Sequence, residues 1–152
     1  MPTILVVDDD QRFLEAAEQM LVRAGYTVLQ ATDGKEAVEV LEKKHQEIDL
    51  AIMDLALPGI NGFELIGAIS RRPNSVKIIA TTGVYKDDLL SMAGALGAHA
   101  AIRKPPDGRS LPERDWLRVI ARLISDASRG ERAASAKVLG IGDVSGPSNA
   151  TE

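Results

Sequence analysis

The sequence predicts a doubly wound α/β domain, in which helices cover both faces of a parallel sheet. Five short apolar runs alternate along the chain with segments of helical periodicity, and the connections between them are short. The central run, residues 50–53, has no polar side, which is typical of a strand buried on both faces. We therefore expect five parallel strands, five flanking helices and right-handed crossovers between them.

The expected elements follow one another in order. The strands are predicted at residues 4–7, 26–31, 50–53, 76–82 and 100–103. The helices are predicted from the aspartates 8–10 to 24, from 33 until the pattern fades by 47, from 63 to before the turn at 73–74, at 89–96, and at 113–127. Asp33 and one of the first three aspartates are candidate N-caps, and Gly25 is a candidate helix stop. In the last helix we expect Leu117, Ile120 and Ile124 to face the core.

Composition excludes several classes of protein. The chain has 18 basic and 22 acidic residues, so its formal charge of −4 provides no basic surface typical of nucleic-acid binding. Cysteine is absent, which excludes disulfides and thiolate metal sites. The N-terminus does not resemble a signal peptide, and no apolar run approaches the roughly 18 residues of a membrane span. We expect a cytoplasmic protein that uses neither nucleic acid nor membrane as a partner.

The length of 152 residues favours one domain, which we place at residues 1–127. Residues 128–152 are rich in Ser, Gly, Ala and Asn with little periodicity, so we expect a disordered C-terminal tail. The apolar stretch 138–141 within it is a candidate docking strip.

Reactive side chains stand at the ends of four expected strands. Asp8 and Asp9 follow the first strand, Asp54 follows the third, Thr82 ends the fourth and Lys104 follows the fifth. In a doubly wound sheet these ends lie along one edge, where ligands bind. If the first and third strands are neighbours, three carboxylates crowd together, and a divalent cation such as Mg²⁺ would offset their repulsion. Lys104 and Thr82 would add a charge and a hydroxyl suited to phosphoryl transfer.

Each of these residues alone has a simpler explanation. An aspartate at a strand end is often only a helix cap, Thr82 could be an ordinary strand residue, and Lys104 could be a solvated charge before a proline turn. The whole set in this order is more specific than any one member.

Five motifs resemble the receiver domain of response regulators in two-component signalling. They are Ile4–Asp10, Met53–Leu55 with Pro58, Gly59 and Gly62, Thr82–Gly83, Gly97–Ala98, and Lys104–Pro105. The resemblance covers about residues 3–127 and implies a five-stranded sheet in the flavodoxin-like order 2-1-3-4-5.

The resemblance also implies roles for the site residues. Asp54 would be the phospho-acceptor. Mg²⁺ would be held by Asp9, by Asp54, by the carbonyl of Ala56 and, through water, by Asp8. Thr82 and Lys104 would contact the phosphoryl oxygens. The implied partners are a sensor histidine kinase or histidine phosphotransfer protein and a downstream protein target, for a stand-alone regulator whose dimerisation the sequence leaves open.

Some positions depart from the family pattern. Ala101 stands where receivers usually carry an aromatic or histidine reporter, Pro106 replaces a frequent Phe, and residues 107–112 form a slightly longer loop. The resemblance also implies that Ala56 and Val84 occupy the positions that flank an attacking water, and neither side chain can orient one. We therefore expect slow autodephosphorylation of an acceptor protein that is not a turnover enzyme.

Other functions compete with this interpretation. A metal-dependent phosphohydrolase would use Asp8 as nucleophile, and Asp8 and Asp10 have its spacing. Gln11 and the following residues differ from the small residues such enzymes carry, and no cap domain is evident. An inactive receiver used only for binding conflicts with the complete acidic set, and a nucleotide-binding domain would need a Gly-rich loop after the first strand. The remaining candidates have structural explanations. We expect His45 to be solvated and His99 to be structural. We expect Trp116 to serve the packing of the last helix rather than to contact a partner.

Overall fold

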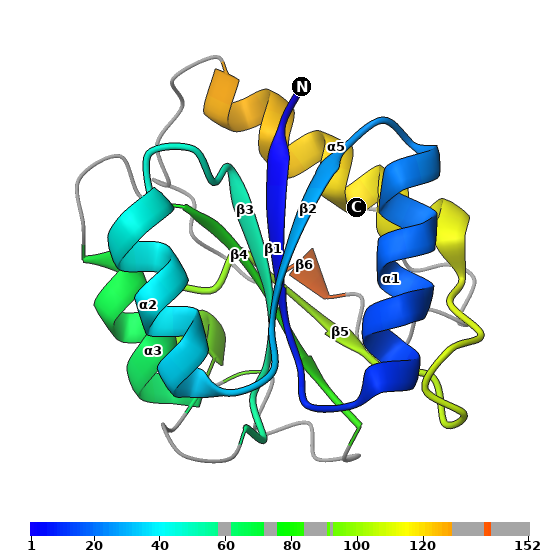
Figure 1. Cartoon of the computed structure of the whole chain (residues 1–152), viewed down its shortest axis with the longest axis horizontal. Coiled ribbons are helices and arrows are strands. Elements are labelled where there is room, and N and C mark those ends of the chain that lie inside the picture. The colour runs from blue at the N-terminus through cyan, green and yellow to red at the C-terminus, as the bar shows by residue number, and fades with distance from the viewer. Residues whose placement is uncertain (58–61, 72–75, 84–90, 92, 129–138, 141–152) are drawn as a thin grey trace.

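The structure is a computed structural model, and it shows a parallel sheet flanked by helices (Figure 1). It describes residues 1–57, 62–71, 76–83, 91, 93–128 and 139–140. Within these residues, no helix combines the length and the apolarity that crossing a membrane requires.

The sheet has the strand order β2-β1-β3-β4-β5-β6, and all neighbouring pairs are parallel. The strands are β1 (Thr3–Val7), β2 (Thr27–Ala31), β3 (Leu50–Asp54), β4 (Lys77–Thr82), β5 (Ala100–Arg103) and β6 (Leu139–Gly140). The first five confirm the predicted order 2-1-3-4-5. Because β1 lies directly beside β3, the ends of these two strands meet at the same edge.

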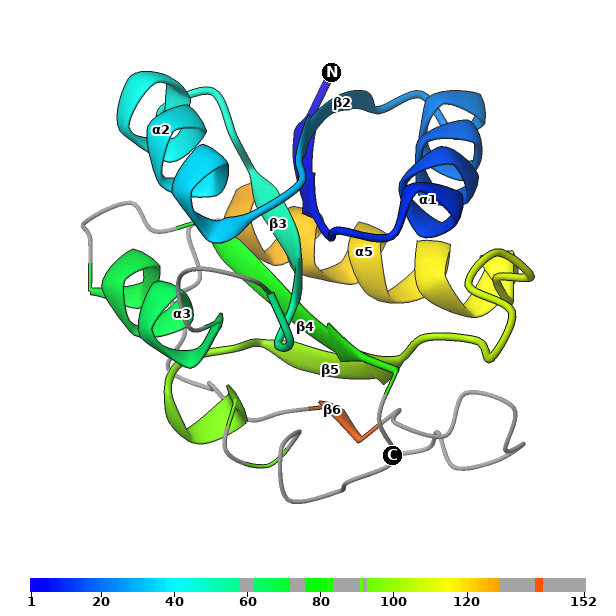
Figure 2. The ribbon, with the colours of Figure 1, turned by 60° about the horizontal axis from the view of Figure 1, so that its bottom comes forward.

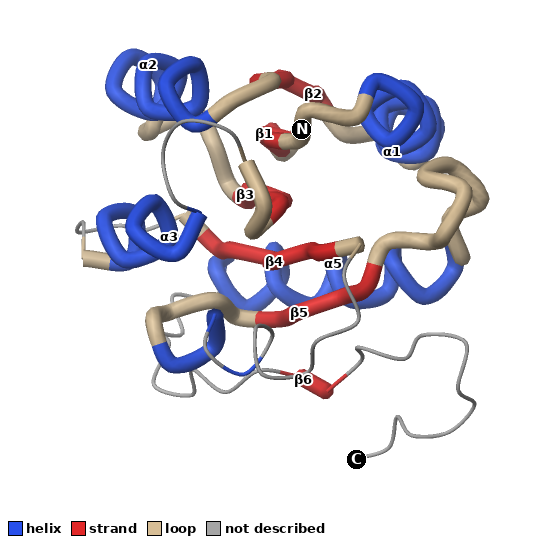
Figure 3. Tube along the Cα trace, turned by 90° about the horizontal axis from the view of Figure 1, so that it is seen from below, coloured by secondary structure: helices blue, strands red, loops and turns tan. Residues whose placement is uncertain are grey.

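The helices with assigned bounds are α1 (Gln11–Arg23), α2 (Gly34–Lys44), α3 (Gly62–Ser70) and α5 (Glu113–Ser128). Figures 2 and 3 show α1 and α5 on one face of the sheet and α2 and α3 on the other. Residues 91 and 93–95 are also helical and belong to the fourth predicted helix, of which residues 89, 90 and 92 lie outside the described part.

The helix ends follow from the local sequence. The Asp10 side chain accepts the backbone N–H of Arg12 at 3.0 Å, and that of Asp33 accepts the N–H of Glu36 at 2.8 Å. Both are the N-caps expected from the sequence, since a carboxylate there satisfies an orphan donor. Gly25 follows α1 with φ at +98°, a conformation that glycine adopts without strain.

Two hydrophobic clusters cover the two faces of the sheet. Alternate residues of one strand enter different clusters, as Leu5 does on the side of α2 and α3 and Ile4 on the side of α1 and α5. Residues 50–53 are all fully buried, as their uninterrupted apolar character predicted. The sheet is therefore a rigid central layer, and it fixes the positions of the side chains at its edge.

The buried stripe of α5 differs from the prediction. Its buried side chains are Trp116, Val119, Ile120 and Leu123. Of the three residues that we expected to face the core, Ile120 is fully buried, while Leu117 and Ile124 are half-buried and pack against the core cluster. Both sets have helical spacing, so periodicity alone does not select between them. The packing of Trp116 against α1 rotates the stripe by one residue.

Strand β6 lies in the segment that we predicted to be a disordered tail. It pairs with β5, Leu139 opposite Ala100 and Gly140 opposite Ala101. These are the inner two residues of the predicted docking strip, and its outer residues 138 and 141 lie outside the described part. Ser128 ends α5, and disorder of the other tail residues stays a prediction.

Candidate functional site

Strand β3 places Asp54 at the centre of the sheet edge. The residue is only 4% exposed, and its register partner on β4 is Thr81. The backbone N–H of Ala56 donates to Asp54 Oδ1 at 3.0 Å, and the N–H of Leu55 donates to the carbonyl of Thr81 at 2.9 Å. The first contact orients the carboxylate through Oδ1, and the second ties the residue after Asp54 to β4.

Strand β1 brings two further carboxylates to the same place. Val7 pairs with Met53, so Asp8 and Asp9 emerge beside the end of β3. One carboxylate oxygen from each of Asp8, Asp9 and Asp54 lies within 4.8 Å of the others. Asp8 is buried and Asp9 is exposed, so the group has an inner side and a solvent side.

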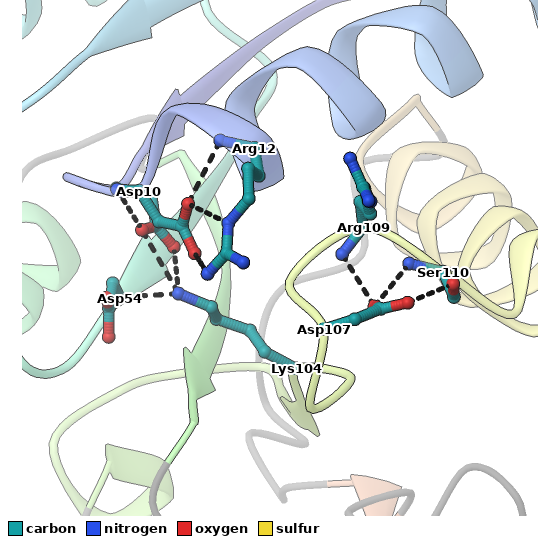
Figure 4. Close-up of polar contacts among 8 residues, drawn as sticks. Asp10, Arg12, Asp54, Lys104, Asp107, Arg109 and Ser110 are labelled. Carbon is teal, nitrogen blue, oxygen red and sulfur yellow. Dashed lines mark hydrogen bonds and ion pairs between the residues drawn. The ribbon is translucent and has the colours of Figure 1, made fainter.

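Lys104 places its ammonium group between the two buried carboxylates. Its Nζ lies 2.9 and 3.1 Å from the two oxygens of Asp8, and 3.6 Å from Asp54 Oδ2. The Lys104 side chain is 10% exposed and points from the end of β5 toward Asp54 (Figure 4). Among the described residues, the ammonium group of Lys104 is thus the cation paired with these two buried carboxylates, and its one positive charge compensates only part of their charge.

The pKa values of Asp8 and Lys104 are both raised, as this shortage of positive charge predicts. Burial, and then the charge of Asp54, raises the pKa of Asp8 to about 6 in spite of the hydrogen bond from Lys104. Burial alone would lower the pKa of Lys104, but its hydrogen bond to Asp8 and the charges of Asp8 and Asp54 raise it instead. Lys104 therefore stays charged, while the ionised form of Asp8 is disfavoured.

These residues fit a hard divalent cation. Mg²⁺ takes oxygen ligands and is usually bound through one or two carboxylates, with waters and phosphate oxygens completing the shell. The three clustered carboxylates supply such ligands, and a cation would relieve the repulsion from Asp54, which after burial is the second cause of the raised pKa of Asp8. Ala56, whose carbonyl is the other predicted ligand, is exposed in the loop that leaves β3.

Thr82 also lies at this edge. It ends β4, one residue beyond the register partner of Asp54, and it pairs with Arg103 on β5. Its side chain is buried. The structure thus brings Asp8, Asp9, Asp54 and Lys104 together, and places Thr82 at the end of the strand between β3 and β5.

Gly62 closes the loop behind Asp54. A Cβ atom at this position would lie 2.9 Å from Leu55 Cα and 3.0 Å from the carbonyl oxygen of Asp54. Both are backbone atoms, so they cannot move aside as a flexible side chain would. Only glycine lets the start of α3 approach the end of β3 this closely, which explains this position of the motif.

The structure adds site neighbours that the sequence did not reveal. Lys104 Nζ lies 5.0 Å from the centre of the Phe13 ring, a cation–π distance. Gly108, buried with φ at +76°, lies against Asp10, because a Cβ there would be 2.8 Å from Asp10 Oδ2. Figure 4 shows Asp10 paired with Arg12 beside the site. In the sequence, Phe13 has helical spacing with Ala17 and Leu21, which indicates a core residue but does not distinguish it further.

The remaining predicted residues have these environments. His99 is buried, and its Nδ1 accepts the backbone N–H of Ile78 at 3.1 Å, which confirms a structural role. Trp116, which belongs to α5, is fully buried, and this confirms that it serves the packing of that helix. His45 differs from the prediction of a solvated residue, because it is half-buried at the C-cap of α2 and its Nδ1 is shielded from solvent.

Comparison with known sequences matches the part of the chain that carries this site. The family model of the response regulator receiver domain matches residues 4–114. The transcriptional regulatory protein AfsQ1 of Streptomyces coelicolor is 35% identical over 136 residues, which are 89% of this chain and 55% of AfsQ1. The response regulator SaeR of Staphylococcus aureus is 29% identical over 111 residues, 73% of this chain and 47% of SaeR. A cyclic di-GMP phosphodiesterase of Thermotoga maritima is 32% identical over 103 residues, 68% of this chain and 27% of that protein.

Solved structures agree with the sequence matches. A CheY-like receiver domain protein from Methanospirillum hungatei is 30% identical with a TM-score of 0.74, covering 86% of this chain and 98% of that one. A receiver domain protein from Clostridium thermocellum is 25% identical with a TM-score of 0.76, and the match covers 85% of this chain and 98% of that one. The chain spans about half or less of the curated relatives it matches, but nearly the whole of these solved domains. It belongs to the response regulator receiver domain family.

Proposed function

We propose that this chain accepts a phosphoryl group on Asp54, with Mg²⁺ bound beside it, and passes the signal on through protein contacts. The observation that carries the proposal is the group of three carboxylates with the Lys104 ammonium 3.6 Å from Asp54 Oδ2. Phosphoryl transfer needs alignment and charge neutralisation more than covalent chemistry, and this group is suited to both.

The proposed step uses the two Asp54 oxygens differently. Oδ1 is held by the N–H of Ala56, and Oδ2 lies toward Lys104. In our proposal Oδ2 attacks the phosphorus of a phosphohistidine, and an O–P bond forms as the N–P bond breaks. The departing electron pair stays on the imidazole nitrogen, which takes a proton from solvent, and Asp54 becomes an acyl phosphate.

The neighbouring residues would bind and neutralise the transferred group. Lys104 is positioned to pair with a phosphoryl oxygen, and the hydroxyl of Thr82 is proposed as a further donor. Asp8, Asp9, Asp54 and the carbonyl of Ala56 are the proposed ligands of Mg²⁺, which would supply positive charge beside the phosphoryl oxygens when bound.

The proposed partners follow from family membership. A sensor histidine kinase or a histidine phosphotransfer protein would donate the group, and a protein target would read it. We propose an acceptor that returns slowly to its free state, rather than an enzyme that turns over an external substrate. Location in the cytoplasm is part of the same proposal, and cell fractionation with a cytoplasmic marker tests it.

The competing hydrolase would use Asp8 as its nucleophile, and the contacts of Asp8 weigh against that role. Both its oxygens accept hydrogen bonds from Lys104, and Oδ1 also accepts the backbone N–H of Asp10 at 2.9 Å. A carboxylate whose two oxygens both accept hydrogen bonds from an ammonium group is a weaker nucleophile than Asp54 Oδ2, which lies 3.6 Å from the same ammonium group.

A small phosphodonor tests the acceptor directly. The protein is incubated with acetyl phosphate, with and without Mg²⁺, and the modified residue is mapped by mass spectrometry. We expect Mg²⁺-dependent modification of Asp54 and none in Asp54→Asn, which keeps the shape of the side chain. Asp10→Asn is the matched control, since it keeps a helix cap at the same edge and should be labelled normally. Full labelling of Asp54→Asn, or a label on Asp8, would contradict the proposal.

A further inference from the structure

A line of contacts leads from the phospho-acceptor to helix α5. Lys104 lies beside Asp54, its ammonium group stands 5.0 Å from the centre of the Phe13 ring, and the centre of that ring is 5.7 Å from the centre of the Trp116 ring. The two rings are tilted by 54°, a geometry typical of attractive aromatic pairs. Four segments contribute, because Asp54 ends β3, Lys104 follows β5, Phe13 belongs to α1 and Trp116 to α5.

Every member of this line is packed. Phe13 and Trp116 have no exposed surface, and Asp54 and Lys104 are nearly buried. In an interior packed this closely, a displaced side chain moves its neighbours. The buried indole N–H of Trp116 has no hydrogen-bond partner among the described residues, so packing rather than a directed polar contact holds this ring.

The position that usually carries the reporter side chain contributes no ring here. Ala101 is buried in the cluster on the opposite face of the sheet, with α2 and α3. A methyl group has no rotamers, so it cannot swing between an outward and an inward position as an aromatic side chain does. A signal from Asp54 to the surface of this chain therefore needs another set of side chains.

We propose that Lys104, Phe13 and Trp116 form a relay that reports the state of Asp54 to helix α5. The inference rests on the proposed function, because it needs a phosphoryl group on Asp54. That group adds negative charge beside Lys104, whose shortest ion pair in the free protein is with Asp8 at 2.9 Å. Lys104 then turns toward the phosphoryl oxygens, and its position over the Phe13 ring changes. Cation–π attraction depends on that position, so the Phe13–Trp116 pair repacks and α5 shifts with it.

The chain carries its own probe for this relay, because Trp116 is its only tryptophan. Indole emission is recorded on the full chain before and after acetyl phosphate in Mg²⁺, and the fraction modified at Asp54 is measured by mass on the same samples. We expect an emission change that follows this fraction and is absent with Mg²⁺ alone and in Asp54→Asn. Phe13→Leu is expected to reduce the change by about half or more, because it removes the ring but keeps an apolar side chain.

Phe63→Leu is the matched control. It changes the only other phenylalanine, which packs against the opposite face of the sheet, and should leave the emission change intact. Phe13→Met is a second variant, and circular dichroism checks that each variant folds. If Asp54 is modified and the emission does not change, or if Phe13→Leu and Phe13→Met respond as the wild type does, the relay is wrong while the acceptor assignment stands. If Asp54 is not modified, the acceptor assignment fails and the relay fails with it.

Discussion

The ammonium group of Lys104 lies 2.9 Å from Asp8 Oδ2, nearer than its distance of 3.6 Å to Oδ2 of Asp54. The free site therefore pairs its lysine mainly with the innermost carboxylate, and Asp54 keeps the weaker contact. The ion pair between Lys104 and Asp54 Oδ2, the oxygen that we propose as the nucleophile, is thus the longer of the two, and the buried site is incompletely neutralised.

Removing the charge of Asp8 should stabilise the free protein. The raised pKa of Asp8, caused first by burial and then by Asp54, already includes the attraction of Lys104, so the ionised carboxylate is a net burden above about pH 6. We expect Asp8→Asn to raise the free energy of unfolding by about 1–2 kcal/mol at neutral pH without Mg²⁺. Urea unfolding measures this, and Asp9→Asn, which removes an exposed charge of the same group, should gain less. A loss of stability in Asp8→Asn would show that the pair with Lys104 outweighs the crowding.

Mg²⁺ should stabilise the wild-type protein by linkage. A cation that binds only the folded state at ten times its dissociation constant contributes about 1.4 kcal/mol. Asp9→Ala should lose most of this gain, because it removes one of the three clustered carboxylates. Thermal unfolding with increasing Mg²⁺ tests this, with Asp10→Asn as a control that keeps the cluster. A wild-type midpoint that does not respond to Mg²⁺ would exclude a metal site here.

His99 should contribute to loss of stability in acid. Burial, and then the nearby charge of Lys77, lowers the pKa of His99 from 6.5 to about 4. The unfolded chain takes up a proton below pH 6.5 that the native protein resists, so stability present above that pH is lost as the pH falls toward 4. The loss should reach about 2 kcal/mol and be absent in His99→Asn, while His45→Asn should retain it. The free energy of unfolding is measured by urea denaturation across this pH range. If it falls with pH equally steeply in all three proteins, the assignment to His99 is contradicted.

Gly62→Ala should disturb both the fold and the acceptor. The added methyl group would meet the backbone of Leu55 and Asp54 at 2.9–3.0 Å, so the start of α3 has to move away from β3. We expect a loss of about 1–3 kcal/mol in unfolding free energy and slower labelling of Asp54. Gly67→Ala in the same helix is the control, because its Cβ meets only the flexible Arg71 side chain at 3.3 Å and alanine favours a helix. If the two variants change the unfolding free energy and the labelling rate equally, the close approach at Gly62 is not the cause of these changes.

The phosphorylated protein should decay slowly. Ala56 is exposed beside Asp54 and offers no side chain that could orient an attacking water. Val84, the second position that we expect to flank the attack, lies outside the described residues. Decay of labelled protein in Mg²⁺ is compared between the wild type, Ala56→Asn, and Ala56→Asn with Val84→Glu. We expect the double variant to decay faster, and an unchanged rate would show that these positions do not set the lifetime.

The sequence by itself determined strands β1 to β5, most helix ends and the side chains at the sheet edge. Residues 50–53 form a short run without a polar side, which is typical of a buried strand. Asp33 and Asp10 cap helices through contacts with their own neighbours in the chain. Asp8, Asp54 and Lys104 each follow a recognisable strand, and parallel strands bring such ends together. These features depend on local interactions or on the topology of the fold.

Tertiary packing decided the rest. The buried face of α5 is set by Trp116 against Phe13, a contact between residues far apart in the chain that helical periodicity cannot specify. The preference of Lys104 for Asp8 over Asp54 depends on differences of less than an ångström between side chains from three strand ends. Such distances arise only when the sheet and both layers of helices are packed together, because charge and burial at the site are properties of the assembled fold.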